Sequence, residues 1–313
     1  MIIKRFPTLS WLRTLTEGKS PTKQIIAPNG QKLQNAKWPS VVLNVQSKEE
    51  YRPNIKGTLS LFTNIKGKTL AGVNDRLVTV QDDTFFLSNQ TERYTLSIDS
   101  HQKVETFNIH FGEDLLNNVY TSLSTPLHKI LVNEYTSSTI EFSSQLYQMD
   151  EQIKYLLSYL YTHQEEFKDP FILEEHLIKI LYQLLSNQAN LFKKINQLPQ
   201  VKKSTQTEVY KRLAWVVDYI YSNLGEVIEL DDLANVACLS KFHFLRLFKH
   251  FFRQTPHQFI NTLRVRKAQH LLIKTEIPII EIAFCLSFEY LSSFTRMFTK
   301  SVGVSPQMYR IRK

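Results

Sequence analysis

The spacing of apolar residues divides the chain into a stretch of strands followed by a stretch of helices. From Thr58 to about Phe111, apolar and polar residues alternate in short runs separated by Gly, Asn and Asp. This alternation predicts strands with one buried face, and the regular turns between them predict an antiparallel sandwich or a small barrel. Residues 1 to about 50 are weakly patterned and contain several prolines, so we expect short strands and loops there.

After Gly112 the apolar period changes to that of a helix. We expect amphipathic helices at about 114–123, 126–135, 144–162 and 170–194. Asp169 is a suitable N-cap for the last of these, and Pro170 suits its first turn. The two longer helices carry leucines on one face. Such a face fits the core of an N-terminal domain and a dimer interface equally well.

Residues 197–208 are polar, include a proline and have no periodicity, which is typical of a linker. The chain therefore divides into an N-terminal domain at 1–196, this linker, and a C-terminal domain at 209–313. The C-terminal domain is predicted to be entirely helical. Its first helix runs from Val209 to Leu224 and ends at Gly225.

A short pattern occurs twice in the C-terminal domain, and its clearest equivalent residues stand fifty positions apart: Arg246 and Arg296, Phe248 and Phe298, Pro256 and Pro306. Each copy predicts a short helix, a tight turn and a longer helix. This is the layout of a helix-turn-helix, whose second helix enters the DNA major groove. A connecting helix of about eighteen residues would span roughly 27 Å, close to the ~34 Å between successive major grooves on one DNA face.

The outward faces of the two longer helices are the candidate DNA-binding sites. In the first copy the candidates are Lys241, Phe242, Leu245, Arg246 and Lys249, and in the second they are Tyr290, Leu291, Ser292, Thr295, Arg296, Thr299 and Lys300. Each arginine could bind guanine or a phosphate. Phe242 and Leu245 could contact thymine methyl groups or be single surface hydrophobes. Arg264, Arg266 and Lys267 of the connecting helix are expected to serve packing, solubility or phosphate binding.

The charge distribution supports a DNA-binding surface. The chain carries a net charge of +9, and residues 240–313 contain 13 Lys or Arg against 3 Asp or Glu. Hydrophobic residues make up 42% and charged residues 21%, which is typical of a globular protein. No apolar run is long enough to cross a bilayer, and the N-terminus lacks the apolar core of a signal peptide, so we expect a cytoplasmic protein without membrane contact.

The sequence offers little for metal or covalent chemistry. Cys238 and Cys285 lie in apolar settings of the repeat, so we expect buried, reduced thiols that form no zinc site. His101, His110 and His128 are scattered, which argues against a metal site. We therefore expect no metal, no cofactor and no catalytic residues. The alternative, an enzyme such as a repair methyltransferase with an attached DNA-binding module, would need an exposed, activated cysteine.

The C-terminal third resembles the DNA-binding domain of the AraC/XylS family of bacterial transcriptional regulators. The resemblance rests on residues 240–244, 264–268, 282–283, 288, 292–298 and 303–310. It implies an α+β protein with an N-terminal cupin-like barrel or sandwich, dimerisation helices and a C-terminal tandem helix-turn-helix. It also places Phe242, Leu245 and Arg246, and Leu291, Ser292, Thr295 and Arg296, at base-facing positions.

The same resemblance implies a transcriptional activator or other regulator of promoter or operator DNA. The implied partners are a second copy of the chain, RNA polymerase and a small-molecule effector. A constitutive regulator whose N-terminal domain only dimerises is also compatible with the sequence. This chain departs from the family at Arg253 and Ser287, where glycine is usual. If either position has positive φ, the residue there is strained.

Overall fold

The structure is a computed structural model that describes residues 1–16, 25–26, 32–33, 38–73, 76–90, 92–124, 142–198 and 203–311. The chain forms two compact units, Met1–Asn190 and Leu191–Lys313. Among the described residues, no helix combines the length and the hydropathy needed to cross a membrane.

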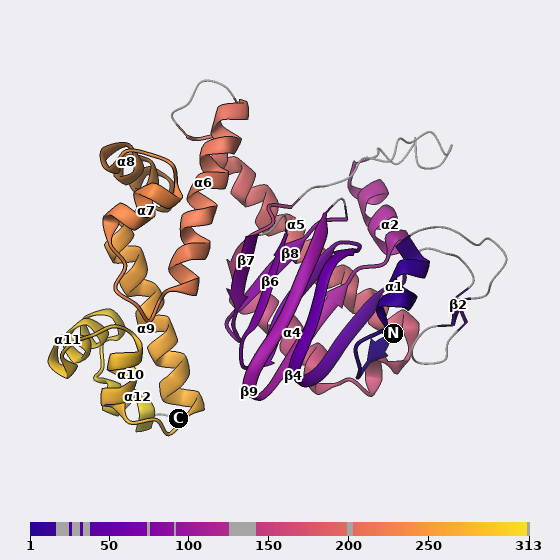
Figure 1. The fold of residues 1–313 in the computed structure, drawn as a ribbon, viewed down its shortest axis with the longest axis horizontal. Helices are drawn as coiled ribbons and strands as arrows, with labels where there is room; N and C mark the ends of the chain where they lie inside the picture. The colour runs from indigo at the N-terminus through magenta and orange to yellow at the C-terminus, as the bar shows by residue number, and fades with distance from the viewer. Residues whose placement is uncertain are drawn as a thin grey trace. The chain divides into compact units, whose positions relative to one another are not determined.

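The first unit is built on one large sheet (Figure 1). Its strands are β1 (Ile2–Ile3), β4 (Val41–Lys56), β5 (Ser60–Lys66), β6 (Thr69–Val73), β7 (Arg76–Val80), β8 (Thr84–Ser88), β9 (Arg93–His110) and β10 (Leu146–Gln148). The main path runs β1-β4-β9-β5-β8-β10, and β6 pairs with both β7 and β9. All these pairings are antiparallel except that of β1 with β4. Helix α1 (Leu9–Thr16) and a separate pair, β2 (Ile25–Ile26) and β3 (Lys32–Leu33), complete the described N-terminal elements.

The sheet differs from the sequence-based expectations in its closure and in the length of one strand. The described strands form an open sheet, in which β1 and β10 end the main path without pairing to each other. The expectation of short strands before residue 50 is confirmed for β1, β2 and β3, which have two residues each, but not for β4, a sixteen-residue strand that begins at Val41. It pairs with the equally continuous β9 from Val41 opposite His110 to Lys56 opposite Arg93. The long partner strand satisfies the backbone of β4 even where its side chains follow no clear alternation.

The helices of the first unit are α2 (Glu113–Ser124), α4 (Glu151–Thr162), a short 3-10 turn (Glu166–Lys168) and α5 (Pro170–Ile195). The helix expected at 144–162 begins only at Glu151, because residues 146–148 pair with β8 as a strand. The carboxylate of Asp150 then accepts a hydrogen bond from the Ile153 amide at 2.8 Å and caps α4. Asp169 accepts from the Phe171 amide at 2.8 Å, as expected for the start of α5. The helix expected at 126–135 lies outside the described residues.

The leucines of α4 and α5 belong to the core of the first unit. Leu157, Leu177 and Leu181 are buried in one cluster with Phe107 and Ile109 of the sheet. The remaining buried members from these helices are Ile153, Leu160, Leu173, Ile180 and Leu184. The sequence left two interpretations of this leucine face, the core of the N-terminal domain and a dimer interface. The burial of these side chains identifies the face as part of the domain core.

The second unit is helical and contains α6 (Lys203–Ser222), α7 (Leu230–Val236), α8 (Lys241–Phe252), α9 (Pro256–Lys274), α10 (Ile279–Cys285), α11 (Leu291–Val302) and α12 (Pro306–Ile311). Helix α6 begins six residues before the expected start, inside the predicted linker. There the side-chain amide of Gln206 donates to the Leu198 carbonyl at 2.9 Å, and both Gln206 and Leu198 are buried. A polar helix held by such tertiary contacts has too weak an apolar period to be seen in the sequence.

Candidate nucleic-acid interface

The first helix-turn-helix consists of α7, a turn and α8. Ala234 of α7 is buried, and its carbonyl accepts a hydrogen bond from the Leu239 amide at 3.0 Å, which closes the turn. The small side chain lets α8 pack closely against α7. Phe244, Leu247 and Phe248 are fully buried on the inner face of α8. Packing of these three side chains fixes which face of α8 remains outside.

The outer face of α8 carries the residues expected from the sequence. Phe242 is 88% exposed, which is exceptional for a phenylalanine, and Leu245 is half-buried. Arg246 and Lys249 are exposed. Lys241 is exposed too, but its ammonium group lies 2.5 Å from the carboxylate of Asp231 on α7. The sequence analysis missed this ion pair, for which the only signal was the two acidic residues in the first turn of α7. Ser240 occupies the expected N-cap position without a capping bond from its hydroxyl.

The second helix-turn-helix consists of α10, a turn and α11. Phe294 and Phe298 are fully buried on the inner face of α11. Tyr290, which precedes the helix, is exposed. The outer face is hollowed, and the six residues lining this shallow hollow are Leu291, Ser292, Thr295, Arg296, Thr299 and Lys300. The structure thus brings all six candidate residues of α11 together on one surface.

The two arginines fifty positions apart have the same setting. Arg246 and Arg296 are both exposed on the outer faces of α8 and α11. Within the described part of the chain, neither makes a hydrogen bond or an ion pair. Their guanidinium groups are therefore available to an external acceptor such as a guanine edge or a phosphate.

Both sites at which this chain replaces an expected glycine have left-handed backbone. Arg253, which ends α8, has φ 59°, and Ser287, in the second turn, has φ 61°. The positive φ on which the expected strain depends is therefore present at both positions. The sequence analysis missed a third such residue, Cys238 in the first turn, with φ 51°. Its position forty-nine residues before Ser287 was the available signal.

The prediction that both cysteines are buried was wrong. Cys238 and Cys285 are exposed. The left-handed conformation of Cys238 places it in the turn instead of on the buried face of α7, and Cys285 occupies the outer side of the last turn of α10, next to buried Leu286. In the described residues, no three His, Cys, Asp or Glu side chains are grouped so that they could hold a metal ion.

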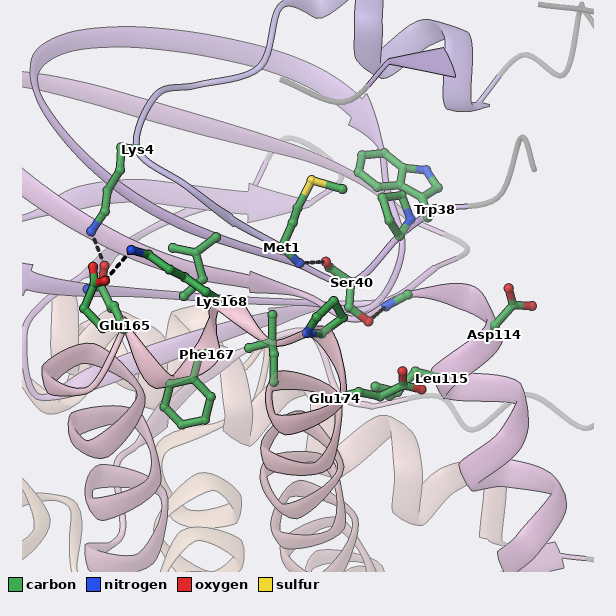
Figure 2. Close-up of a pocket in the computed structure, with 16 residues that line it drawn as sticks. Met1, Lys4, Trp38, Ser40, Asp114, Leu115, Glu165, Phe167, Lys168 and Glu174 are labelled. Carbon is green, nitrogen blue, oxygen red and sulfur yellow. Dashed lines mark hydrogen bonds and ion pairs between the residues drawn. The ribbon is translucent and has the colours of Figure 1, made fainter. Parts of the chain in front are cut away.

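Among its described residues, the first unit has a larger and a smaller cavity. One, of about 540 Å³, opens between β1, the residues before β4, the start of α2 and the start of α5 (Figure 2). It is lined by apolar side chains such as Trp38, Leu115 and Phe167, and by charged ones that include Lys4 and Glu174. The other lies beside Phe62, Tyr94 and His110 of the sheet and measures only about 10 Å³.

The smaller cavity is filled by the chain itself. The Arg52 guanidinium donates to the Pro7 carbonyl at 2.6 Å and lies over the Phe6 ring. His110 is buried beside Ser60, with 2.8 Å between Nδ1 and Oγ. Burial, assisted by the positive charge of Arg52, lowers the pKa of His110 to about 4, so the imidazole is neutral at neutral pH. The remaining volume is about that of one water.

Comparison with known proteins agrees with the geometry of the second unit. A family model described as a helix-turn-helix domain matches residues 233–312. The chain is 39% identical over 98 residues to the transposon Tn10 TetD protein of Escherichia coli, covering 31% of this chain and 71% of that protein. It is 27% identical over 172 residues to the probable transcriptional regulator LumQ of Photobacterium leiognathi, covering 54% of this chain and 64% of LumQ.

Among solved structures, the DNA-binding domain of AdpA in complex with a target DNA is 31% identical to this chain, with a TM-score of 0.32. That alignment covers 32% of this chain and 91% of the AdpA chain. The chain spans slightly less than two thirds of the length of LumQ, and the other two alignments each cover about a third of this chain.

Proposed function

Because this chain belongs to the AraC/XylS family of bacterial transcriptional regulators, we propose that it binds promoter or operator DNA by sequence and regulates transcription. The observation that carries the proposal is the pair of recognition helices, α8 and α11, which expose Arg246 and Arg296 at equivalent positions. Two such helices on one chain can occupy two successive major grooves. LumQ is described as a probable transcriptional regulator, and we propose no catalytic role for this chain.

The outer faces of α8 and α11 suit different base sequences. On α8, exposed Phe242 and half-buried Leu245 offer apolar surface to thymine methyl groups beside a guanine bound by Arg246. On α11, the hydroxyls of Ser292 and Thr295 lie beside Arg296. Lys241, Lys249 and Lys300 suit phosphates, while Tyr290, Leu291 and Thr299 complete the proposed contact set. We therefore expect an operator with two dissimilar blocks about one helical turn apart.

Selection from a randomised double-stranded DNA library, followed by footprinting, tests this function directly. The full-length protein should enrich two blocks, and its affinity for the selected DNA should fall steeply as salt rises, because phosphate contacts release counterions. Enrichment of no sequence, or binding that is independent of salt, would contradict DNA reading. A C-terminal fragment for the same assay should start at Leu191, since the second unit begins there and α6 starts at Lys203.

We also propose that the chain forms a homodimer through the outer face of α5. Its inner leucines are already buried, so Leu184→Glu should unfold the first unit instead of producing a folded monomer. The outer stripe at helical spacing consists of exposed Phe171, Glu175 and Tyr182 and half-buried Ile178, and Phe171 is 83% exposed. Phe171→Glu should give folded monomers in analytical ultracentrifugation. A wild-type protein that is monomeric at micromolar concentration, with and without DNA, would rule out the dimer.

A small-molecule effector, if this regulator uses one, fits the larger cavity of the first unit. Its volume of about 540 Å³ lies within the roughly 300–1,000 Å³ that is usual for ligand pockets, whereas the cavity beside His110 is too small.

Regulation of promoters also implies the cytoplasm as location and RNA polymerase as partner. We propose the two domains indicated by the sequence, 1–196 for sensing or dimerisation and 209–313 for DNA binding. The compact units divide slightly earlier, between Asn190 and Leu191, and α6 adds residues 203–208 of the linker to the DNA-binding domain.

A further inference from the structure

One arginine of the connecting helix touches both helix-turn-helix copies. Arg264 lies in the middle of α9 and is half-buried. Its Nε donates to the Leu224 carbonyl at 3.2 Å, and its Nη2 donates to the Glu226 carbonyl at 2.8 Å. Both carbonyls belong to the turn that leads into α7 of the first copy. The same guanidinium lies over the ring of Phe288, 5.6 Å from its centroid, in the second copy.

The backbones of the two copies meet at this junction. Gly225 stands between the two carbonyls that accept from Arg264, and a Cβ added there would lie 2.7 Å from the carbonyl oxygen of Cys285, at the end of α10. Only glycine permits so close an approach without a backbone shift. Phe288 in turn packs edge-on against Phe294 of α11, with ring centroids 5.5 Å apart. The contact therefore reaches the buried face of the second recognition helix.

A guanidinium is the group best suited to this position. It presents several N–H donors in a rigid plane, which can satisfy two carbonyls while its face lies against an aromatic ring. Burial lowers the pKa of Arg264, but an arginine remains charged at any physiological pH. A lysine could reach one carbonyl but could not reproduce the planar fork.

We propose that Arg264 is a positioning residue that fixes the orientation of the two recognition helices relative to each other, and so sets the spacing of the two DNA blocks. Helix α9 connects the copies and packs against α8 of the first and against α10 and α11 of the second, where Ala268 and Leu272 are buried. The junction at Arg264 adds a second attachment between them. The consequence for DNA spacing rests on the proposed DNA binding, whereas the orientation of the helices does not.

Spin-label distance measurement on the full chain without DNA tests the orientation. The labels are attached at Asn235→Cys on α7 and Ser301→Cys on α11, both exposed and outside the proposed contact set. Native Cys238 is replaced by Asn, which tolerates left-handed backbone, and Cys285 by Ser. Double electron–electron resonance should give one narrow distance distribution in this background and a clearly broader one after Arg264→Ala.

Three further variants keep the test decisive. Arg266→Ala removes the same charge from the same helix, about 200° around the axis from Arg264, and should leave the distribution narrow. Arg264→Lys keeps the charge and should broaden the distribution even if the alanine variant fails to fold. Gly225→Ala should shift its mean, because the new Cβ must push the Cys285 carbonyl away. Unchanged distributions in folded Arg264→Lys and Gly225→Ala would overturn the proposal.

The effect on DNA spacing is measured separately with DNA selected by the wild-type protein. One base pair inserted between the two blocks should weaken wild-type binding on the order of tenfold, as a misplaced contact does, and should weaken Arg264→Lys binding by a clearly smaller factor. Equal factors would overturn the link between Arg264 and spacing. If the distances behave as expected but the selection enriches no sequence, the proposed DNA reading fails while the positioning role stands.

Discussion

The two helix-turn-helix copies share their interior and differ on their surface. Helices α8 and α11 each have twelve residues, and each buries two phenylalanines. Those of α8 precede the equivalent phenylalanines of α11 by fifty positions. Each turn contains a left-handed residue, as does the end of each recognition helix. The side chains buried between the short helix and the longer one must fill a closely packed space, so few residue types suit these positions. The outward positions carry no such constraint and can diverge with the DNA that they face.

The outward positions have in fact diverged at every equivalent site except the arginine. Phe242, Leu245 and Lys249 of the first copy correspond to Ser292, Thr295 and Thr299 of the second. The first face is thus apolar and basic, and the second carries hydroxyl groups. A chain with two identical faces would suit a direct repeat, whereas this one suits two unlike blocks.

The aromatic packing also differs in extent. Phe248 contacts three other rings, those of Phe244, Phe252 and Phe259, with centroids between 4.4 and 5.5 Å away. Its equivalent Phe298 contacts two rings, Phe294 and Tyr309, at 5.8 and 5.5 Å. The phenylalanine of the first copy therefore has more aromatic neighbours than its equivalent in the second.

Removal of these two equivalent side chains should have the largest effect on stability. Phe248→Ala and Phe298→Ala should each lower the free energy of unfolding by about 3–5 kcal/mol, because each leaves a cavity in a fully buried site. We expect the larger loss at Phe248, which has more aromatic neighbours. Urea unfolding followed by circular dichroism measures both. A larger loss at Phe298 would show that the aromatic contacts do not decide the difference.

The two arginines test whether both copies read DNA. Arg246→Ala and Arg296→Ala should each weaken specific binding by about 1–3 kcal/mol if each guanidinium binds guanine. Specificity should relax in a different block for each variant, as measured by repeating the DNA selection. A uniform loss of affinity on all sequences would instead identify the arginines as phosphate contacts. If only one of the two variants loses specific affinity, only the copy that contains that arginine recognises bases through it.

The difference between the outward faces can be tested through the DNA itself. If Phe242 and Leu245 contact thymine methyl groups, replacing thymine by uracil in the first block should weaken binding by about 1 kcal/mol per methyl contact. The same replacement in the second block should have a smaller effect, because the hydroxyl groups of Ser292, Thr295 and Thr299 share that face of α11 with Leu291. Titration of the two modified duplexes measures the difference. With Phe242→Ala, the effect in the first block should be reduced.

The repeat was predictable from sequence because buried and exposed positions recur at a fixed offset. The helices of the second unit and the outward residues of α8 and α11 followed from that offset. The sheet was less predictable, since β4 is stabilised by hydrogen bonds to β9, a partner distant in sequence. The ion pair of Lys241 with Asp231 and the exposure of both cysteines depend on side-chain orientation in turns, which apolar spacing does not determine.

The left-handed positions give the smallest expected effects and the most direct comparison of the copies. Gly303 has φ 85° and ends α11 where Arg253, with φ 59°, ends α8. Arg253→Gly should raise the free energy of unfolding by up to about 1 kcal/mol, because it relieves the backbone strain of a residue with a Cβ.

Gly303→Ala should lower the free energy of unfolding by a similar amount. An added Cβ would meet no atom within 4 Å there, so the loss would come from the backbone conformation alone. Arg253→Ala controls for loss of the exposed side chain and should change stability little, since alanine keeps the strain. Thermal unfolding of the three variants gives the comparison. If Arg253→Gly and Arg253→Ala are equally stable, the strain at the end of α8 is negligible, and the family's preference for glycine there needs another explanation.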